Sequence, residues 1–341
     1  PPRSTLDRSS AASDVYKRQL KLFCEDRYQS AIEIDELTIM PGHAGFAYGF
    51  RVSTESMQES WFIRFPPPNV NWVGTADVLR QVEVLNALDK TDVPHCSVKW
   101  SGTDLEWFDR PYFVVPLLEG DVLRLGEDDW GSSLSRTQLE NFGRQAMESL
   151  ARIHKVSVEE VPYLGDPVPF EEDVTRWDKF VERAAEPQRI AAAGEVRKRL
   201  IESIPSDAPV GIFHGDFQTA NLFSSEHAKL LAVIDWELTG IGATLNDVGW
   251  ICTFSDSLAW GSESSRSYFL EPETLITFYE DAHGQAVESI EWYRALAAYK
   301  FSVISGFNLS LHRRGKRVDE TWEQTALSMQ PLMERALDLL S

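Results

Sequence analysis

Residues 214–221 read His-Gly-Asp-Phe-Gln-Thr-Ala-Asn, and Asp235 follows at the end of the apolar run 230–234. This stretch sets a carboxylate beside a glycine, an amide five residues later, and a second carboxylate at the end of a predicted strand. In phosphoryl transfer a protein mainly positions the reactants and holds the metal ions that neutralise the phosphate charge. One group that orients the attacking hydroxyl and two oxygen ligands for Mg²⁺ are therefore sufficient. The stretch predicts a site for phosphoryl transfer.

This chemistry gives each polar residue of the stretch a role. Asp216 is the predicted base, which accepts or orients the proton of the attacking hydroxyl. Asn221 and Asp235 are the predicted Mg²⁺ ligands, each through an oxygen atom. Gly215 lets the chain turn tightly before the base. The alternative is an ordinary turn in which Asp216 and Asn221 only cap nearby backbone groups.

Length and charge limit the class of protein. At 341 residues the chain exceeds one typical hydrophobic core, so we expect two lobes. A formal net charge of -20 argues against a nucleic-acid partner, because phosphate backbones require a basic surface. The same charge would suit a cationic substrate, or it serves only as a solubilising acidic surface. The three cysteines have neither disulfide-like nor zinc-ligand spacing.

No apolar run approaches the length of a membrane span, and no secretory leader opens the chain. We therefore expect a cytoplasmic protein with no membrane partner.

The first nineteen residues differ from the rest of the chain. Residues 14–19, Asp-Val-Tyr-Lys-Arg-Gln, match the in-frame translation of a transposon end used in sequencing libraries. We interpret residues 1–19 as non-native adaptor translation and leave them out of the fold prediction.

Residues 20–117 are predicted to form an N-terminal nucleotide-binding lobe of α+β class. Apolar and polar residues alternate in three segments, as in an antiparallel meander, and a helix and a fourth strand follow. The predicted strands are 32–39, 46–52, 61–65 and 112–115, and the predicted helix is 76–88. Proline and glycine at 116–120 then indicate a hinge.

The turn 41–45, between the first two predicted strands, contains Gly42 and Gly45. Glycines there would let backbone amides approach phosphate groups. A plain hairpin turn is the alternative.

Residues 118–341 are predicted to form a larger, mainly helical catalytic and substrate lobe. The predicted helices are 139–154, 172–185, 195–204, 245–254, 273–282, 291–311 and 321–340. His154 closes the first of them and is expected to be structural. The basic cluster 313–317 would either meet an anionic substrate or cap a helix C-terminus.

The chain resembles the aminoglycoside phosphotransferase-like family of the protein-kinase-like fold, and it is similar to the acyl-CoA-dehydrogenase-associated group within that family. The resemblance rests on HGDFQTANLF from His214 and on AVIDWELTGIGATLNDVGW from Ala232 to Trp250. WFIRFPPP from Trp61 and LHRRGKR from Leu311 support it. It implies a two-lobed fold and a kinase that uses ATP and Mg²⁺.

The resemblance assigns the same roles to the catalytic stretch. Asp216 matches the catalytic base, and Asn221 and Asp235 match the Mg²⁺ ligands. His214 matches the histidine that braces the catalytic turn, and Asp247 matches the carboxylate that binds the same loop through backbone amides.

The resemblance also implies a nucleotide site. The Pro116 carbonyl and the Leu118 amide fall where the family's hinge binds the adenine edge. Arg64 stands where many kinases have a phosphate-pairing lysine and would grip phosphate oxygens, unless it points to solvent from an edge strand. Gln81 stands where the pairing glutamate is usual, so we expect a weaker partner for Arg64.

The implied activity is transfer of the γ-phosphoryl group of ATP to a hydroxyl of a small molecule. The resemblance favours a hydroxyacyl metabolite as acceptor, whereas the acidic charge favours an amino sugar or amino alcohol. Two other classes stay open: a catalytically weak pseudokinase that binds nucleotide as a sensor or scaffold, and a Mg²⁺-dependent hydrolase.

Overall fold

The computed structural model describes residues 5–40, 46–67, 70–103, 105–126, 129–261 and 267–341. These described residues form two compact units, one of those up to residue 90 together with those in 95–119, and one of residues 91–94 together with those from residue 120 on. The lobe boundary expected after residue 117 stays a prediction. Each unit is described by itself.

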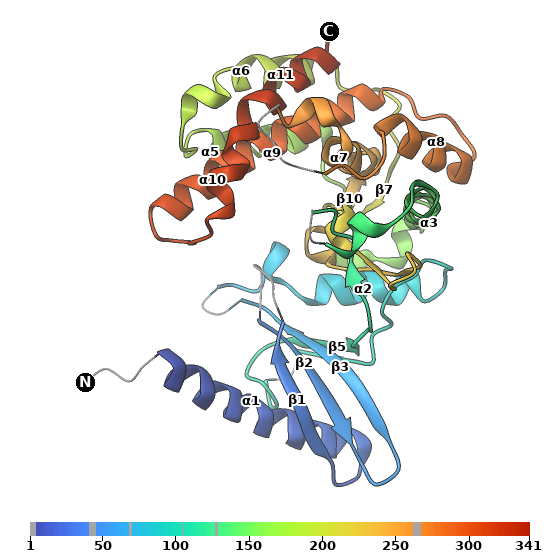
Figure 1. The fold of residues 1–341 in the computed structure, drawn as a ribbon, viewed down its shortest axis with the longest axis vertical. Helices are drawn as coiled ribbons and strands as arrows, with labels where there is room; N and C mark the ends of the chain where they lie inside the picture. Colours follow the sequence, from blue (N-terminus) through green and yellow to red (C-terminus); the bar gives the residue numbers. More distant parts are fainter. Residues whose placement is uncertain (1–4, 41–45, 68–69, 104, 127–128, 262–266) are drawn as a thin grey trace. The chain divides into compact units, whose positions relative to one another are not determined.

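The first unit is built on a five-stranded antiparallel sheet of order β1-β2-β3-β5-β4 (Figure 1). Its strands are β1 Glu33–Ile39, β2 Phe46–Ser53, β3 Gln58–Phe65, β4 Trp100–Gly102 and β5 Tyr112–Pro116. The sequence predicted all of these except β4, because three residues are too few to show an alternating pattern. The central position of β3 also rules out an edge-strand position for Arg64.

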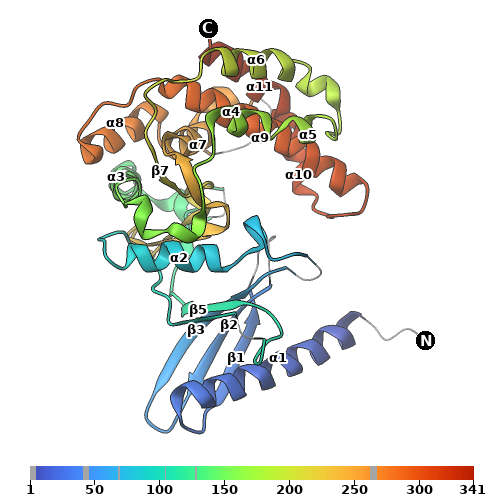
Figure 2. The same cartoon turned by 180° about the vertical axis from the view of Figure 1, so that it is seen from behind.

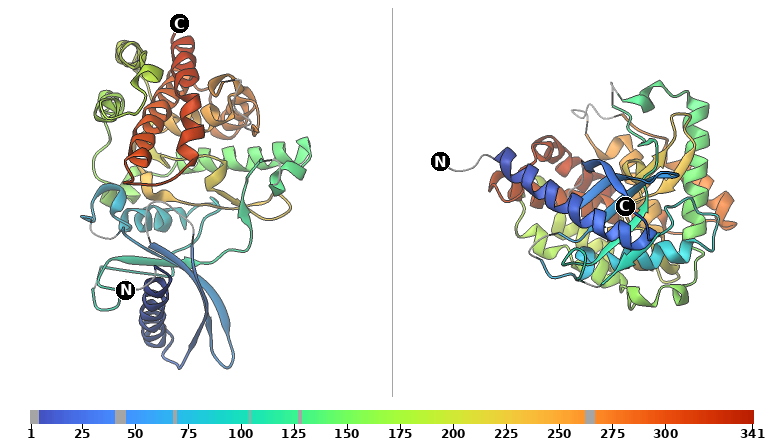
Figure 3. Two further views of the ribbon diagram at one scale, coloured as in Figure 1. Left: turned by 60° about the vertical axis from the view of Figure 1, so that its left-hand side comes forward. Right: turned by 90° about the horizontal axis from the view of Figure 1, so that it is seen from below.

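Helix α1, Thr5–Tyr28, packs against this sheet and lies along it in Figure 3. Leu20, Phe23 and Cys24 are fully buried in a core shared with the strands. The ring of Phe23 meets Tyr112 edge-on at 5.3 Å between centroids. The predicted N-terminal lobe, which begins at residue 20, contained no helix in this segment. The non-native origin of residues 1–19 stays a prediction.

Helix α2, Leu79–Leu88, begins three residues later than predicted. Residues Gly74–Ala76 instead form a short 3-10 turn, and Asp77 is extended, with φ -86° and ψ 100°. The side chain of Asp77 accepts the N–H of Leu79 at 3.0 Å, so an Asx turn replaces the expected first turn of the helix.

The second unit contains two small antiparallel sheets that deliver the catalytic stretch. One pairs β7 Val210–Phe213 with β10 Gly240–Ala243. The other has the order β6-β8-β9, with β6 Asp121–Val122, β8 Leu222–Ser224 and β9 Leu230–Val233. Residues 214–221 connect β7 to β8, and Asp235 follows β9. The backbone N–H of Ile234 binds the Asn221 carbonyl at 3.0 Å, so the two segments lie side by side.

Helices surround these sheets, with α7 Leu245–Ser255 packed against α9 Ile290–Arg313 (Figures 1 and 2). Helix α7 is buried on nearly all sides, as expected for a helix that is apolar around its circumference. The remaining longer helices are α3 Arg136–Ile153, α6 Ala193–Glu202, α8 Pro272–His283 and α11 Met329–Leu339. None of the described helices is both long and apolar enough to span a membrane. The expected cytoplasmic location stays a prediction.

Two predicted helices are interrupted. The segment predicted as one helix at 172–185 forms α4 Phe170–Thr175 and α5 Asp178–Val181, and the indole N–H of Trp177 binds the Asp173 carbonyl at the break. The segment predicted at 321–340 forms α10 Thr321–Thr325, a 3-10 turn and α11. Periodicity alone does not reveal such breaks, because the apolar spacing continues through them.

Gly249 lets α7 approach α9 closely, because a Cβ at this position would lie 2.5 Å from the Tyr293 carbonyl oxygen. We expect Gly249→Ala to lower the free energy of unfolding by about 1–3 kcal/mol, through forced separation of the two helices. Urea unfolding measures this change. The matched control is Gly194→Ala on α6, where a Cβ meets nothing within 4 Å and no stability should be lost. Equal stability of the two variants would contradict the close approach.

Candidate active site

The turn before the predicted base requires glycine. Gly215 has φ +90°, and a Cβ there would lie 2.5 Å from the Leu238 carbonyl oxygen. Both the left-handed backbone and the close contact exclude a side chain. The sequence predicted a tight turn at Gly215, and the contact with Leu238 explains why no other residue fits there.

Asp247 binds this turn from the first turn of α7. Its Oδ2 accepts the backbone N–H of His214 at 2.7 Å, and its Oδ1 accepts that of Gly215 at 2.8 Å. His154 Nε2 also lies 3.2 Å from Oδ2, and Tyr279 binds the other nitrogen of that ring at 2.8 Å. Burial alone would raise the pKa of Asp247, but the hydrogen bond from His154 and the backbone hydrogen bond from His214 lower it below its ordinary value.

His214 connects the turn to the strand end that precedes Asp235. Its Nε2–H donates to the Ile234 carbonyl at 2.9 Å, and its Nδ1 accepts the backbone N–H of Asp216 at 3.2 Å. These two bonds define one neutral tautomer, because a ring nitrogen that accepts carries no proton. The ring is fully buried and packs on Trp236 at 4.6 Å between centroids.

Asp216 receives hydrogen bonds on both carboxylate oxygens. Trp250 Nε1–H and Gln218 Nε2–H donate to Oδ1 at 2.7 and 2.8 Å, and Asn221 Nδ2–H donates to Oδ2 at 2.8 Å. A carboxylate has about four lone-pair sites, so one site on Oδ2 is left for a substrate hydroxyl. Burial raises the pKa of Asp216 above its ordinary value, although the hydrogen bonds from Trp250 and Asn221 oppose that rise.

Sequence reasoning assigned no role to Trp250 or Gln218. Trp250 lies three residues after Asp247 on α7, so both face the same side of the helix and reach the same loop. The three-residue spacing from Asp247, within the motif segment 232–250, could have indicated that Trp250 faces the catalytic loop. Gln218 lies two residues after Asp216 within the loop itself, where spacing gives no direction for the side chain.

Asn221 and Asp235 are the predicted Mg²⁺ ligands, and their metal roles stay predictions. The Asn221 amide nitrogen donates to the carbonyl and to Oδ2 of Asp216, both at 2.8 Å, which turns the amide oxygen away and makes it available to a cation. Asp235 adopts a left-handed conformation with φ 64°, and its charge contributes to the raised pKa of Asp216. A carboxylate oxygen and an amide oxygen are hard donors of the kind that Mg²⁺ prefers, with water and phosphate oxygens completing its shell.

The residues predicted to bind the nucleotide belong to the first unit. Arg64 alternates with the buried Ile63 and Phe65, so it projects from the face of the sheet opposite α1. Gln81 is buried on α2, which packs against β5. These roles stay predictions. Gly42 and Gly45 lie outside the described residues.

The hinge residues end β5. The Leu117 N–H binds the Ser60 carbonyl on β3 at 3.0 Å. Because backbone groups alternate in direction along an extended strand, the Pro116 carbonyl points away from β3. Pro116 and Leu118 are both half-buried, and their contact with an adenine stays a prediction.

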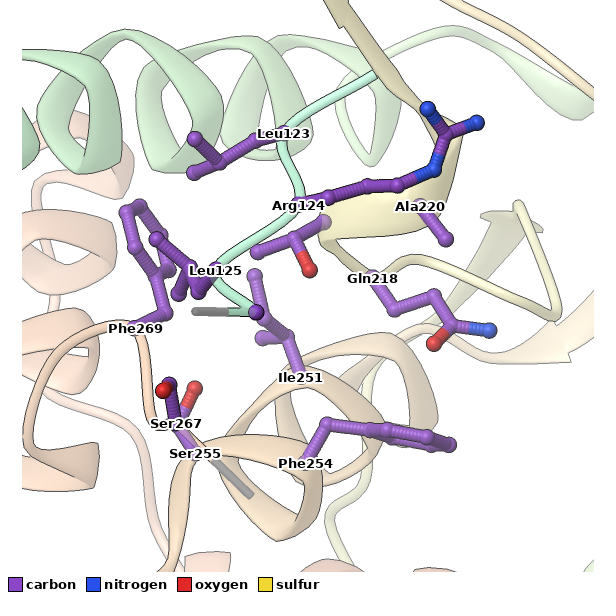
Figure 4. Close-up of a pocket in the computed structure, with 12 residues that line it drawn as sticks. Leu123, Arg124, Leu125, Gln218, Ala220, Ile251, Phe254, Ser255, Ser267 and Phe269 are labelled. Atoms are coloured by element: carbon purple, nitrogen blue, oxygen red, sulfur yellow. The ribbon is translucent and has the colours of Figure 1, made fainter. Parts of the chain in front are cut away.

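A cavity of about 360 Å³ adjoins the catalytic loop within the second unit. In Figure 4 the side chains of Leu123, Leu125, Ile251 and Phe269 surround it, and the guanidinium of Arg124 points away. Arg124 binds Asp121 at 2.6 Å. The loop contributes Gln218, Thr219 and Ala220 to the lining.

We expect Asp247→Asn to lower the free energy of unfolding by about 3 kcal/mol at pH 7, because an amide cannot accept both backbone N–H groups. A folded-state pKa below the ordinary value of about 4 stabilises the protein above that pH, and this stabilisation is lost as the pH falls through the folded-state pKa. Urea unfolding should therefore show the difference between wild type and variant shrinking below about pH 4. The exposed Asp207→Asn is the control, and a difference independent of pH would contradict the assignment.

Solved structures share this fold. A protein from Ralstonia eutropha JMP134, described provisionally as an aminoglycoside phosphotransferase, has a TM-score of 0.77 and 19% identity, over 95% of this chain and 97% of that chain. Wild-type aminoglycoside 2'-phosphotransferase-IIIa in its GDP complex has a TM-score of 0.65 and 14% identity, over 94% of this chain and 99% of that chain. The α+β kinase-like fold predicted from the sequence is confirmed.

Among curated proteins, acyl-CoA dehydrogenase family member 11 of Homo sapiens is 24% identical over 294 residues. The match covers 82% of this chain and 37% of the relative's length. The phosphotransferase enzyme family matches residues 41–293, which include the whole catalytic stretch. The chain belongs to the phosphotransferase enzyme family.

Proposed function

We propose that the protein is a kinase that transfers the γ-phosphoryl group of Mg²⁺-bound ATP to a hydroxyl of a small molecule. One observation carries this proposal: the Asp216 carboxylate is fixed by three side-chain donors and retains one acceptor site on Oδ2. A base held in this way would orient an attacking hydroxyl without reorganising during the reaction. The raised pKa of Asp216 would bring it closer to that of an efficient proton acceptor.

The other side chains would bind and orient the reactants. Asn221 and Asp235 would hold Mg²⁺, which when bound neutralises charge on the phosphates. Arg64 would grip phosphate oxygens, with Gln81 as a neutral partner. The solved relative contains GDP, so GTP is a candidate donor beside ATP.

The acceptor would be a hydroxyacyl metabolite or an amino sugar or amino alcohol. The name of the curated relative, an acyl-CoA dehydrogenase family member, supports the first. The aminoglycoside enzymes among the solved structures support the second. Both classes offer a hydroxyl to the same base.

We expect Asp216→Asn to lower turnover roughly 10²–10⁴-fold and to leave nucleotide affinity nearly unchanged, because a base acts in the transition state. Asp235→Asn should instead remove the Mg²⁺-dependent part of nucleotide binding. Steady-state turnover and calorimetric titration with ATP and with GTP, each with and without Mg²⁺, measure the two effects. The acceptor panel holds hydroxyacyl-CoA thioesters, aminoglycosides and amino alcohols.

The proposal is wrong if both variants retain wild-type turnover with an accepted substrate. Mg²⁺-dependent nucleotide binding without any turnover would favour the pseudokinase.

We expect Trp250→Phe to lower kcat about 10-fold with the nucleotide KM unchanged, because it removes one charge-assisted donor to the base. Steady-state kinetics with the accepted substrate measure this. The control is Trp292→Phe, which loses an equivalent bond, from Trp292 Nε1–H to the Leu200 carbonyl at 2.9 Å, away from the base. A matching fall in kcat for the control would mean that Trp250 acts through stability alone.

A further inference from the structure

Lys300 on α9 lies against two indole rings. Its ammonium is 5.4 Å from the ring centre of Trp177 and 5.3 Å from that of Trp250. Cations are attracted to aromatic faces in this geometry. The side chain is half-buried, so the ammonium is held in place while part of the residue stays open to solvent.

Within the described residues, the structure gives Lys300 no carboxylate at ion-pair distance. The two carboxylates that flank Trp177 have other partners. Asp178 accepts Arg197 Nε–H at 2.8 Å, and Asp173 binds the amide of Asn246. In a chain of net charge -20, a cation held on aromatic rings and not on an acid is a candidate for binding an anion from outside.

Among the residues that the structure describes, two other basic residues near the places where an anion could bind are already paired with carboxylates, unlike Lys300. Arg313, in the cluster expected to meet an anionic substrate or to cap a helix, binds Glu323 at 2.7 Å and Glu186 at 2.8 Å. Arg124, beside the catalytic loop, binds Asp121. The charges of both residues are thus already matched within the protein.

One indole connects Lys300 to the predicted base. Trp250 presents its ring face to the Lys300 ammonium and donates its N–H to Asp216 Oδ1 at 2.7 Å. The ammonium and the base are therefore separated by a single ring. Phe254 and Phe301 pack on the same indole at 5.3 and 5.9 Å between centroids and extend an apolar wall around it.

We propose that Lys300 determines acceptor specificity by binding a carboxylate or phosphate that the acceptor carries in addition to its hydroxyl. This inference rests on the proposed kinase activity. In the transfer, the acceptor oxygen bonds to the γ-phosphorus, and the bond from that phosphorus to the β–γ bridging oxygen breaks. The nucleoside diphosphate leaves with the electron pair, and the hydroxyl proton passes to Asp216. Lys300 takes no part in these bond changes and orients the acceptor.

Anion binding at Lys300 favours a hydroxyacyl metabolite over an amino sugar or amino alcohol as the acceptor. An ammonium beside the base repels amino sugars and attracts hydroxy acids or hydroxyalkyl phosphates. The twelve described residues that line the cavity beside the catalytic loop include no Asp or Glu, which a polycationic acceptor would need. Lys300 is not one of them, but Phe254, which packs on Trp250, is. Their apolar members would accommodate a hydrocarbon chain.

The experiment uses the full chain with Mg²⁺ and the better nucleotide. The acceptor probes are short terminal hydroxy acids of increasing chain length, their neutral amides, the matching amino alcohols and the matching hydroxyalkyl phosphates. Initial rates are measured for wild type, Lys300→Met and Lys300→Arg. Calorimetric binding of the same probes to Asp216→Asn, with and without Lys300→Met, gives a readout independent of turnover.

Wild type should prefer an anionic probe to its amide at least 10-fold in kcat/KM, and the acid and phosphate arms identify which anion is favoured. Lys300→Met should raise the KM for that probe about 10-fold while the amide and nucleotide KM stay unchanged, and Lys300→Arg should restore the preference. The matched control is Lys179→Met, because Lys179 lies over the Phe180 ring at 5.2 Å but is exposed and makes no contact with Trp250.

Equal rates or equal binding of anion and amide in wild type would overturn the role of Lys300 and leave the kinase proposal standing. Lys300-dependent binding of the anion without phosphoryl transfer would overturn the kinase proposal and retain the anion site. If wild type binds none of the anionic probes more tightly than the matching neutral amide, Lys300 does not bind an anion, even if the protein phosphorylates the probe.

Discussion

The site depends on one buried carboxylate that binds two consecutive backbone amides. Asp247 accepts the N–H groups of His214 and Gly215, and it thereby fixes the turn that presents Asp216. His154 and Tyr279 complete its surroundings, so the charge is compensated although it is fully buried. Because Asp247 lies in the first turn of α7, the same contact connects the catalytic loop to the helical core. The buried helix α7 thus holds a short irregular segment in place.

A second connection runs through His214 to the strand end that precedes Asp235. Its ring bridges the Ile234 carbonyl and the Asp216 amide, and so the loop and the end of β9 hold a fixed register. Asn221 returns two hydrogen bonds to Asp216. Asp216 and Asn221 therefore belong to one hydrogen-bonded network, and Asp235 directly follows the residue whose carbonyl His214 binds. Networks of this kind are stable only when each buried member has a partner, which limits the substitutions they accept.

The sequence predicted much of this arrangement because the motif places its polar residues on one loop and one strand end. His214, Asp216, Asn221 and Asp247 are joined by hydrogen bonds, although their catalytic roles stay predictions. Short or interrupted elements were missed, since β4 has only three residues and the segment 172–185 keeps its apolar spacing through a break. Trp250 was missed although its spacing from Asp247 on α7 was visible, because its role depends on how far the indole reaches toward the catalytic loop. Lys300 is separated from the motif by a further helix, and only packing reveals their proximity.

The indole of Trp250 serves two neighbours at once, the base through its N–H and the cation through its ring face. This sharing has an evolutionary consequence. A substitution of Trp250 would change the turnover rate and the choice of acceptor at the same time, so a variant with a new acceptor would also have an altered rate. A change at position 300 leaves the base and its donors intact. Divergence toward new acceptors within this scaffold should therefore proceed through α9 before it reaches α7.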